Sequence, residues 1–257
     1  MIFSKEQLAQ ENLYKFPYHY CVNFKKYFSM IYLFDWGINY ASTVEFILKK
    51  IENQANIKSI IDIGCGEGRL TRELSLNFPD IKVDGVDYSK RAIQLATALN
   101  SNTNIHFMQE DIIQNSLVNK YDVATLMEVY EHIDPSDATA FLKGIHNSLN
   151  EDGVLYLTVP HKNIPQTPHH YRHFSIKSLT HEVEEYFDIE EVIPFEKISK
   201  KRKWIMRIMA NRLFILNSKR LNTLIYNYYK KNLFFVNDET ECQRIYLKCS
   251  KKKISQC

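Results

Sequence analysis

The spacing of hydrophobic positions changes repeatedly between residues 58 and 195. Short compact apolar runs predict strands, and the segments between them, with apolar residues three or four apart, predict amphipathic helices. The expected strands are 59–64, 81–87, 105–109, 121–127 and 153–159, and the expected helices are 67–78, 89–100 and 135–150. Strands that alternate with helices in this way indicate βαβ units and a doubly wound, mostly parallel sheet.

Two further strands are expected near the C-terminal end, FDIEEVIPFE and CQRIYLKCS, which would make the sheet seven-stranded. The aromatic segment before residue 58 is expected to be a helical lid. The predicted fold class is therefore α/β. Its expected parts are an N-terminal helical lid or cap (1–57), the ligand-binding core (58–196), a basic helical insertion (197–240) and the final strand with the tail (241–257).

The insertion has an unusual charge. The 257-residue chain has a net charge of +3, yet residues 197–237 contain eleven Lys or Arg and no acid, and the rest carries 22 basic and 30 acidic residues. A helix with a solvated basic face explains this pattern, as does a platform for phosphate. Docking of 200–231 on anionic lipid is a further interpretation. Nucleic acid is the least supported partner, because the body of the chain is acidic.

The cysteines and the N-terminal segment bear on the compartment. Five cysteines occur without a C-x-x-C pair, which argues against a disulfide framework. No apolar run reaches the roughly 18 residues needed to span a bilayer. The segment MIFSKEQLAQEN lacks the basic start and apolar stretch of a secretory signal. We therefore expect a cytoplasmic protein.

Glycines crowd into the stretch IDIGCGEGRL, after the first expected strand of the core. Gly64, Gly66 and Gly68 follow a G-x-G-x-G spacing, which differs from the dinucleotide fingerprint G-x-G-x-x-G. Glycines between a strand and a helix let the backbone turn sharply and approach a ligand closely. Asp62 and Glu67 disfavour a pyrophosphate here and favour a ligand with a cationic amino group.

Carboxylates also end the next two strands. Asp87 closes IKVDGVD and is suited to both hydroxyls of a ribose, and Asp111 in QEDI is suited to an adenine amine. In a parallel sheet these strand ends share one edge. A nucleoside that carries an amino acid fits all three positions, which predicts S-adenosylmethionine as the ligand.

The chain resembles the class I (Rossmann-like) S-adenosylmethionine-dependent methyltransferases in the segments DIGCGEG, GVDYS, QEDI and YDVATLMEVYEH, over residues 58–195. The resemblance implies a methyltransferase with S-adenosylmethionine as methyl donor. The residues it implies for donor binding are Asp62, Gly64, Gly66, Gly68, Asp87, Tyr88, Asp111, Ile112 and Glu128.

Candidate reaction groups follow the fourth and fifth strands. A helical turn at MEVYEHID would bring Glu128, Glu131 and His132 together. The segment TVPHKNIPQTPHHYRHFS adds the histidines His161, His169, His170 and His173. One interpretation makes His132, His170 or His173 the base that removes the acceptor proton.

A second interpretation is that Glu128, Glu131, His132 and His170 or His173 hold a divalent ion such as Mg²⁺, Mn²⁺ or Fe²⁺. A third gives these side chains no chemical role: Glu128 would only contact the donor and the histidines would lie in a surface loop.

The E-x-x-E-H arrangement is similar to that of metal-dependent small-RNA 3′-terminal 2′-O-methyltransferases and of ubiquinone-pathway O-methyltransferases. YKFPYHY and PHHYRHFS resemble methyltransferases of bacterial surface-polysaccharide clusters. The latter resemblance implies O-methylation of a small phosphorylated or nucleotide-linked, sugar-like acceptor, or of its phosphate or phosphoramidate group, in capsule synthesis. Methylation of an RNA 3′ end and a non-catalytic binding protein are the alternatives. In methyltransferases of this fold, N-terminal aromatic segments commonly close over the donor. The resemblance therefore implies that Tyr14, Tyr18 or His19 faces the site.

Overall fold

The computed structural model describes residues 4–14, 17–23, 29–30, 36–100, 105–209, 216 and 218–253. Its centre is a seven-stranded sheet in the order β5-β4-β3-β6-β7-β9-β8, in which only β9 runs antiparallel to its neighbours. The strands are β3 (Ser59–Ile63), β4 (Lys82–Asp87), β5 (His106–Gln109), β6 (Tyr121–Met127), β7 (Leu149–Pro160), β8 (Phe187–Lys197) and β9 (Cys242–Lys251). The predicted doubly wound, mostly parallel sheet is confirmed.

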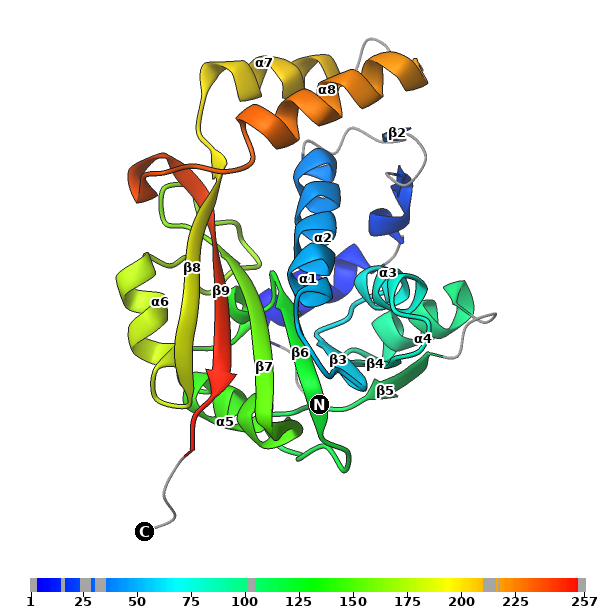
Figure 1. Ribbon diagram of the computed structural model, residues 1–257, viewed down its shortest axis with the longest axis vertical. Coiled ribbons are helices and arrows are strands. Elements are labelled where there is room, and N and C mark those ends of the chain that lie inside the picture. The colour runs from blue at the N-terminus through cyan, green and yellow to red at the C-terminus, as the bar shows by residue number, and fades with distance from the viewer. Residues whose placement is uncertain are drawn as a thin grey trace.

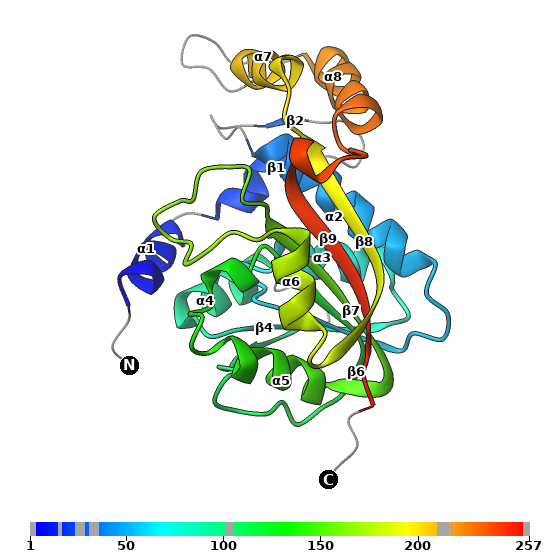
Figure 2. The same cartoon turned by 90° about the vertical axis from the view of Figure 1, so that its left-hand side faces the viewer.

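Helices cover both faces of the sheet (Figures 1 and 2). α2 (Gly37–Glu52) and α3 (Arg69–Asn77) bury their apolar side chains in one core cluster, and α5 (Ala138–Ser148) and α6 (Ile176–Val183) bury theirs in the other. α4 (Lys90–Leu99) packs beside β4 and β5. The first three turns of α2 contain mostly apolar or small residues, and this part of the helix is buried on nearly every side.

The N-terminal part mixes helix and strand. α1 (Lys5–Leu13) is followed by a 3₁₀ turn, η1 (Tyr18–Cys21), and by the short antiparallel pair β1 (Val22–Asn23) and β2 (Ser29–Met30). The expectation of a wholly helical segment therefore fails at β1 and β2. Backbone pairing of Val22 with Met30 replaces helical hydrogen bonds there.

The basic segment forms a helical hairpin, α7 (Lys200–Met209) and α8 (Lys219–Asn232), between β8 and β9. The short turn η3 (Glu239–Glu241) leads into β9. Figure 1 shows the hairpin at the top of the molecule, beyond the ends of the parallel strands. Within the described residues, no helix has the length and apolar character to cross a membrane.

Candidate active site

The glycine-rich loop between β3 and α3 follows a path that side chains would obstruct. Gly64, Gly66 and Gly68 all have positive φ, between 54° and 78°, a region that favours glycine. A Cβ atom on Gly66 would lie 3.2 Å from the Tyr14 hydroxyl, and one on Gly64 would lie 2.6 Å from a Val129 methyl carbon. The loop is thus shaped for close packing on both sides.

Asp87, at the end of β4, ties this loop to the next strand. Its carboxylate accepts hydrogen bonds from the backbone N–H of Gly66 (2.9 Å) and of Ser89 (2.8 Å). Burial raises the pKa of Asp87 to about 6. Asp87 also lines the main cavity, at the strand end predicted from the sequence.

Both carboxylate oxygens of Asp62 are used in hydrogen bonds to neighbouring elements. Its two oxygens accept hydrogen bonds from the hydroxyls of Thr71 in α3 (2.7 Å) and Thr125 in β6 (2.8 Å). Burial raises the pKa of Asp62 to about 6, although both hydroxyls act against that rise. Asp62 therefore joins β3, α3 and β6 beneath the loop while still lining the cavity. We call residues 62–68 together with Asp87 the donor loop.

The N-terminal segment lies against the donor loop. Glu67 is fully buried and accepts hydrogen bonds from the backbone N–H (2.9 Å) and the ring Nδ1 (2.7 Å) of His19. Burial would raise the pKa of Glu67, but the charge and hydrogen bonds of His19 lower it below the usual range. Tyr14 and His19 line the cavity, as the lid interpretation expects. The side chain of Tyr18 lies outside the described residues.

One cavity of about 710 Å³ connects the donor loop with the predicted reaction groups. Tyr88, Asp111 and Ile112 line it beyond β4 and β5. Asp111 accepts a hydrogen bond from the backbone N–H of Ile113 (3.1 Å), which fixes its turn. The strand-end residues predicted for donor binding thus border a single space.

Glu131 lies in the 3₁₀ turn η2 (Tyr130–His132), after β6, and is 1% exposed. Neither of its carboxylate oxygens has a hydrogen-bond partner among the described residues. Burial and the neighbouring Glu128 raise its pKa well above the usual range. A buried carboxylate without hydrogen bonds is strongly disfavoured unless a proton or a cation compensates it.

The tautomer of His132 follows from its backbone contact. Its Nδ1 lies 2.7 Å from the carbonyl oxygen of His169, so Nδ1 carries the proton and donates it. Nε2 then keeps its lone pair, 4.0 Å from a Glu131 oxygen. Burial lowers the pKa of His132 to about 4, which keeps the ring neutral at pH 7.

His170 is held in the same way through a second histidine. His173 Nδ1 donates to the carbonyl of Ile164 (3.2 Å), so its Nε2 accepts from Nδ1 of His170 (2.8 Å). His170 Nε2 therefore also presents a lone pair. Burial and the neighbouring imidazoles lower the pKa of His170 to about 2.

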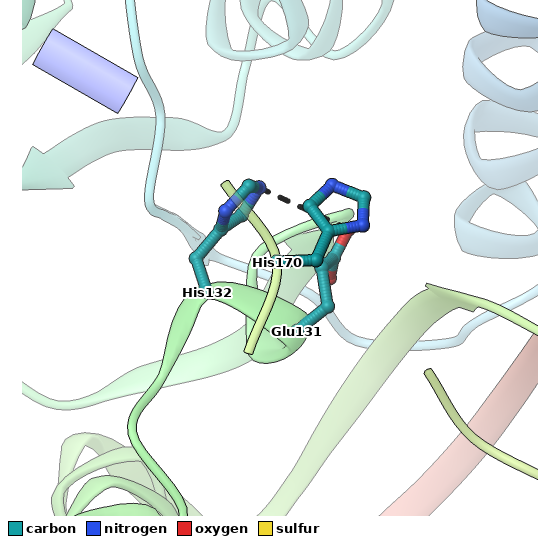
Figure 3. A group of neighbouring side chains, drawn as sticks. All are labelled: Glu131, His132 and His170. Carbon is teal, nitrogen blue, oxygen red and sulfur yellow. Dashed lines mark ion pairs between the residues drawn. The ribbon is translucent and has the colours of Figure 1, made fainter. Parts of the chain in front are cut away.

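Glu131, His132 and His170 offer ligand atoms that all lie within 4.8 Å of one another (Figure 3). His173 supports this group from behind rather than joining it. We call these four residues the histidine cluster. Three of the four residues in the predicted ligand set thus come together.

Glu128, the fourth predicted ligand, is directed elsewhere. It has a positive φ of 55°, and its carboxylate pairs with Arg244 of β9 at 2.8 Å. Arg244 also pairs with the fully buried Glu196, which in turn pairs with Arg202 of α7. Glu128 thus ends an ionic network through one oxygen, while its other oxygen is buried without a hydrogen-bond partner among the described residues and the residue lines the same cavity.

Sequence reasoning missed Arg244, which lines the cavity. It lies 116 positions from Glu128 in the sequence. Its position in the alternating strand pattern of β9 gave no sign of the contact, which arises only because β9 lies beside β7. His161, also considered from the sequence, is buried away from the cluster and pairs with Glu239 at 2.9 Å.

A family model described as "Methyltransferase domain" matches residues 39–208. Malonyl-[acyl-carrier protein] O-methyltransferase of Halalkalibacterium halodurans is 36% identical over 34% of this chain and 34% of its own length. Ubiquinone biosynthesis O-methyltransferase of Pasteurella multocida is 31% identical over 46% of this chain and 53% of its own. The matches span 34 to 41% of the length of the first curated relatives.

Solved structures share the fold at low identity. The N-methyltransferase NodS from Bradyrhizobium japonicum WM9, in complex with S-adenosyl-L-homocysteine, has a TM-score of 0.62 at 12% identity, over 97% of this chain and 100% of its own. A SAM-dependent methyltransferase from Archaeoglobus fulgidus has a TM-score of 0.55 at 16% identity, over 81% of this chain and 93% of its own. These similarities confirm the Rossmann-like methyltransferase fold.

Proposed function

The chain belongs to the methyltransferase-domain family, and we propose that it transfers a methyl group from S-adenosylmethionine to an oxygen atom of a small acceptor. The donor loop turns tightly at Gly64 and Gly66, where a Cβ would meet Val129 or Tyr14, two side chains that line the cavity. Asp87 would bind the ribose hydroxyls, and Asp111 the adenine amine. Tyr14 and His19 would cover the donor from the N-terminal side and exclude water.

The observation that carries the proposal is the histidine cluster at the other end of the same cavity. Two imidazoles there present lone pairs beside a buried carboxylate that accepts no hydrogen bond within the described part of the chain. Such a set can accept the proton of an acceptor hydroxyl, or can bind a cation that takes the place of that proton. It has no evident purpose in a protein that only binds the donor.

We further propose that Glu131, His132 and His170 hold a divalent ion, for which Mn²⁺ or Fe²⁺ suits the mixed oxygen and nitrogen donors. The fit rests on the two orphaned oxygens of Glu131. It also rests on the backbone carbonyls behind His132 and His173, because ligating histidines ordinarily donate their other N–H to such groups. When bound, the ion would lower the pKa of an acceptor hydroxyl.

The protein's own residues have separate tasks in this reaction. The donor loop orients the donor, and His173 fixes the tautomer and direction of His170. If no ion is bound, His132 Nε2 is itself the proton acceptor, since the ring is neutral at pH 7. Positioning of donor and acceptor in one enclosed cavity supplies much of the remaining acceleration.

For the acceptor we propose a hydroxyl, phosphate or phosphoramidate of a small phosphorylated or nucleotide-linked, sugar-like molecule in bacterial capsule or surface-glycan synthesis. Its support is the resemblance of PHHYRHFS, the segment that carries His170 and His173. The curated relatives are named for acyl-carrier-linked and ubiquinone-pathway O-methylation, so an oxygen acceptor agrees with both.

The test is methyl transfer from labelled S-adenosylmethionine to a panel of sugar nucleotides, phosphorylated small molecules, phenols and a short RNA. Each is assayed with EDTA and with Mn²⁺. We expect an O-methylated small molecule and a rate that EDTA abolishes and Mn²⁺ restores. A rate indifferent to EDTA would remove the ion and leave the histidine base. Methylation of the RNA 3′ end alone would overturn the proposed acceptor. Donor binding without turnover on any acceptor would favour the non-catalytic alternative.

A further inference from the structure

The α7–α8 hairpin has one side fixed to the body of the protein. Met206, Tyr226 and Tyr229 are buried in the same core cluster as α2. Lys230 pairs with Glu45 of α2 at 2.6 Å, and Arg202 pairs with Glu196. These contacts hold the hairpin in one orientation, so its outer side has a defined shape.

That outer side carries a group of exposed apolar side chains. Trp204 of α7 and Leu224 of α8 are 64% and 66% exposed, and Tyr228 is 40% exposed. Together with Ile205 and Ile225 they line a shallow apolar groove between the two helices. Contiguous exposed apolar side chains of this kind mark an interaction surface.

Cations surround the groove. No acidic residue occurs in residues 197–237. The exposed basic side chains of the two helices include Lys200, Lys201, Lys203, Arg207, Arg220 and Lys231. The remainder of the chain has a balance of −8, so positive charge is concentrated at this end of the molecule. Long-range attraction would therefore turn the protein so that the hairpin approaches an anionic partner first.

We propose that the outer side of the α7–α8 hairpin docks on the surface of an anionic lipid bilayer. Trp204, Leu224 and Tyr228 would enter the interfacial region, where aromatic and aliphatic side chains are stabilised. The surrounding Lys and Arg side chains would reach the headgroups while their stems cover apolar area. A nucleic acid or an acidic protein would match the cations, but it would not account for a groove with aliphatic walls.

The location gives the docking a consequence for the site. The hairpin lies at the end of the sheet where the parallel strands terminate, which is also the end that carries the donor loop and the histidine cluster (Figures 1 and 2). Docking would hold that end toward the bilayer. The geometry thus favours acceptors that reside at, or are delivered from, a membrane surface.

The test is flotation of the full-length protein with vesicles of phosphatidylcholine alone or with 30–40% phosphatidylglycerol, roughly the anionic fraction needed for a strong surface potential. We expect at least roughly tenfold tighter binding to the anionic vesicles, weakened by high salt. Trp204 is one of two tryptophans. Its fluorescence should shift to the blue and be quenched by brominated lipid, and W204F should lack that response.

Two variants separate the apolar and electrostatic parts. W204S/L224S should abolish the salt-resistant fraction of binding, and K201E/K203E/R207E should weaken total binding at least roughly tenfold. L76S and K90E/K177E are the matched controls, because these exposed residues lie away from the hairpin. Circular dichroism and thermal melts verify folding of each variant.

Absence of vesicle binding by the wild-type protein would overturn the proposal. So would vesicle binding that the hairpin variants leave unchanged, or saturable binding of a short RNA or an acidic carrier protein at this surface without any vesicle binding. Transfer of methyl to a soluble acceptor is measured in parallel. Retained transfer in W204S/L224S would show that loss of docking is separate from loss of the proposed catalytic activity.

Discussion

The two ends of the main cavity differ in how well their polar groups are satisfied. In the donor loop, the carboxylates of Asp62 and Asp87 each accept two hydrogen bonds from the protein. In the histidine cluster, Glu131 accepts no hydrogen bond from any residue that the structure describes, although it is just as deeply buried. Apart from one oxygen of Glu67, the carboxylates of the donor loop are therefore satisfied by the protein, whereas Glu131 needs a proton or a cation to compensate it.

Under the proposed function, this difference separates a region that recognises the donor from a region where the reaction takes place. Because hydrogen bonds already fix the donor loop, little conformational entropy is lost when the donor binds. A buried carboxylate beside two neutral imidazoles is a strained electrostatic arrangement, and such arrangements concentrate where chemistry takes place. Changes at the two ends should therefore affect different measurements, and each prediction below tests that separation.

The largest effect is expected for His132→Ala. Removing the Nε2 lone pair should lower kcat by about 10²–10⁴-fold, because either a general base or an ion ligand is lost. Donor affinity, measured by calorimetry with S-adenosylhomocysteine, should change less than about twofold. His181→Ala on the exposed end of α6 is the matched control and should retain kcat. Equal losses of kcat and of donor affinity would show that the two ends are not separate.

Asp87→Ala should have the next largest effect, with the opposite signature. It removes the acceptor of the Gly66 and Ser89 N–H groups as well as the proposed ribose contact. We expect donor affinity to fall by about 10–100-fold, the loss typical of hydrogen bonds to a charged group. Asp80→Ala, an exposed site before β4, is the control. Unchanged donor affinity would remove the donor from this strand end.

Glu131→Gln tests the unsatisfied carboxylate through stability. A folded-state pKa raised above the unfolded value contributes stability at low pH that is lost as pH rises. Without added metal, the variant should therefore be about 1–2 kcal/mol more stable than wild type at pH 7 and equal to it near pH 4. Mn²⁺ should raise the melting temperature of wild type alone. If Mn²⁺ leaves the melting temperature of the wild type unchanged, and the variant melts at the same temperature as the wild type, Glu131 is compensated by protonation within the fold.

Much of the donor end follows from the sequence, because its residues are local. Gly64, Gly66 and Asp87 lie at strand ends that hydrophobic periodicity alone identifies. Parallel pairing then brings those ends to one edge, as in the register of Asp62 with Gly85. Short-range pattern and one topological rule were sufficient there.

The other end depends on contacts that periodicity does not encode. Pairing of Glu128 with Arg244 needs β9 beside β7, and the support of His170 by His173 needs the path of one irregular loop. The position of Glu67 under His19 depends on how the N-terminal segment packs. Residue types therefore identified candidate ligands, whereas chain packing decided which of them meet.

Near neutral pH, the pH dependence should show the smallest effect, and it should report on the donor end. Asp62 and Asp87 have pKa values of about 6, raised by burial, so both are ionised only above that pH. The donor is a cation, and its kcat/KM should fall by roughly tenfold per pH unit for each group once the pH is below 6.

The histidine cluster should not contribute to this acid limb, because burial holds the pKa of His132 near 4 and that of His170 near 2. Protonation of the two aspartates favours the folded state as pH falls, whereas the histidines, neutral in the fold, disfavour it below their unfolded pKa. A thermal melt at each pH therefore accompanies the rate profile. An acid limb in kcat that disappears in Glu131→Gln would assign the titration to the cluster and would remove the separation of the two ends.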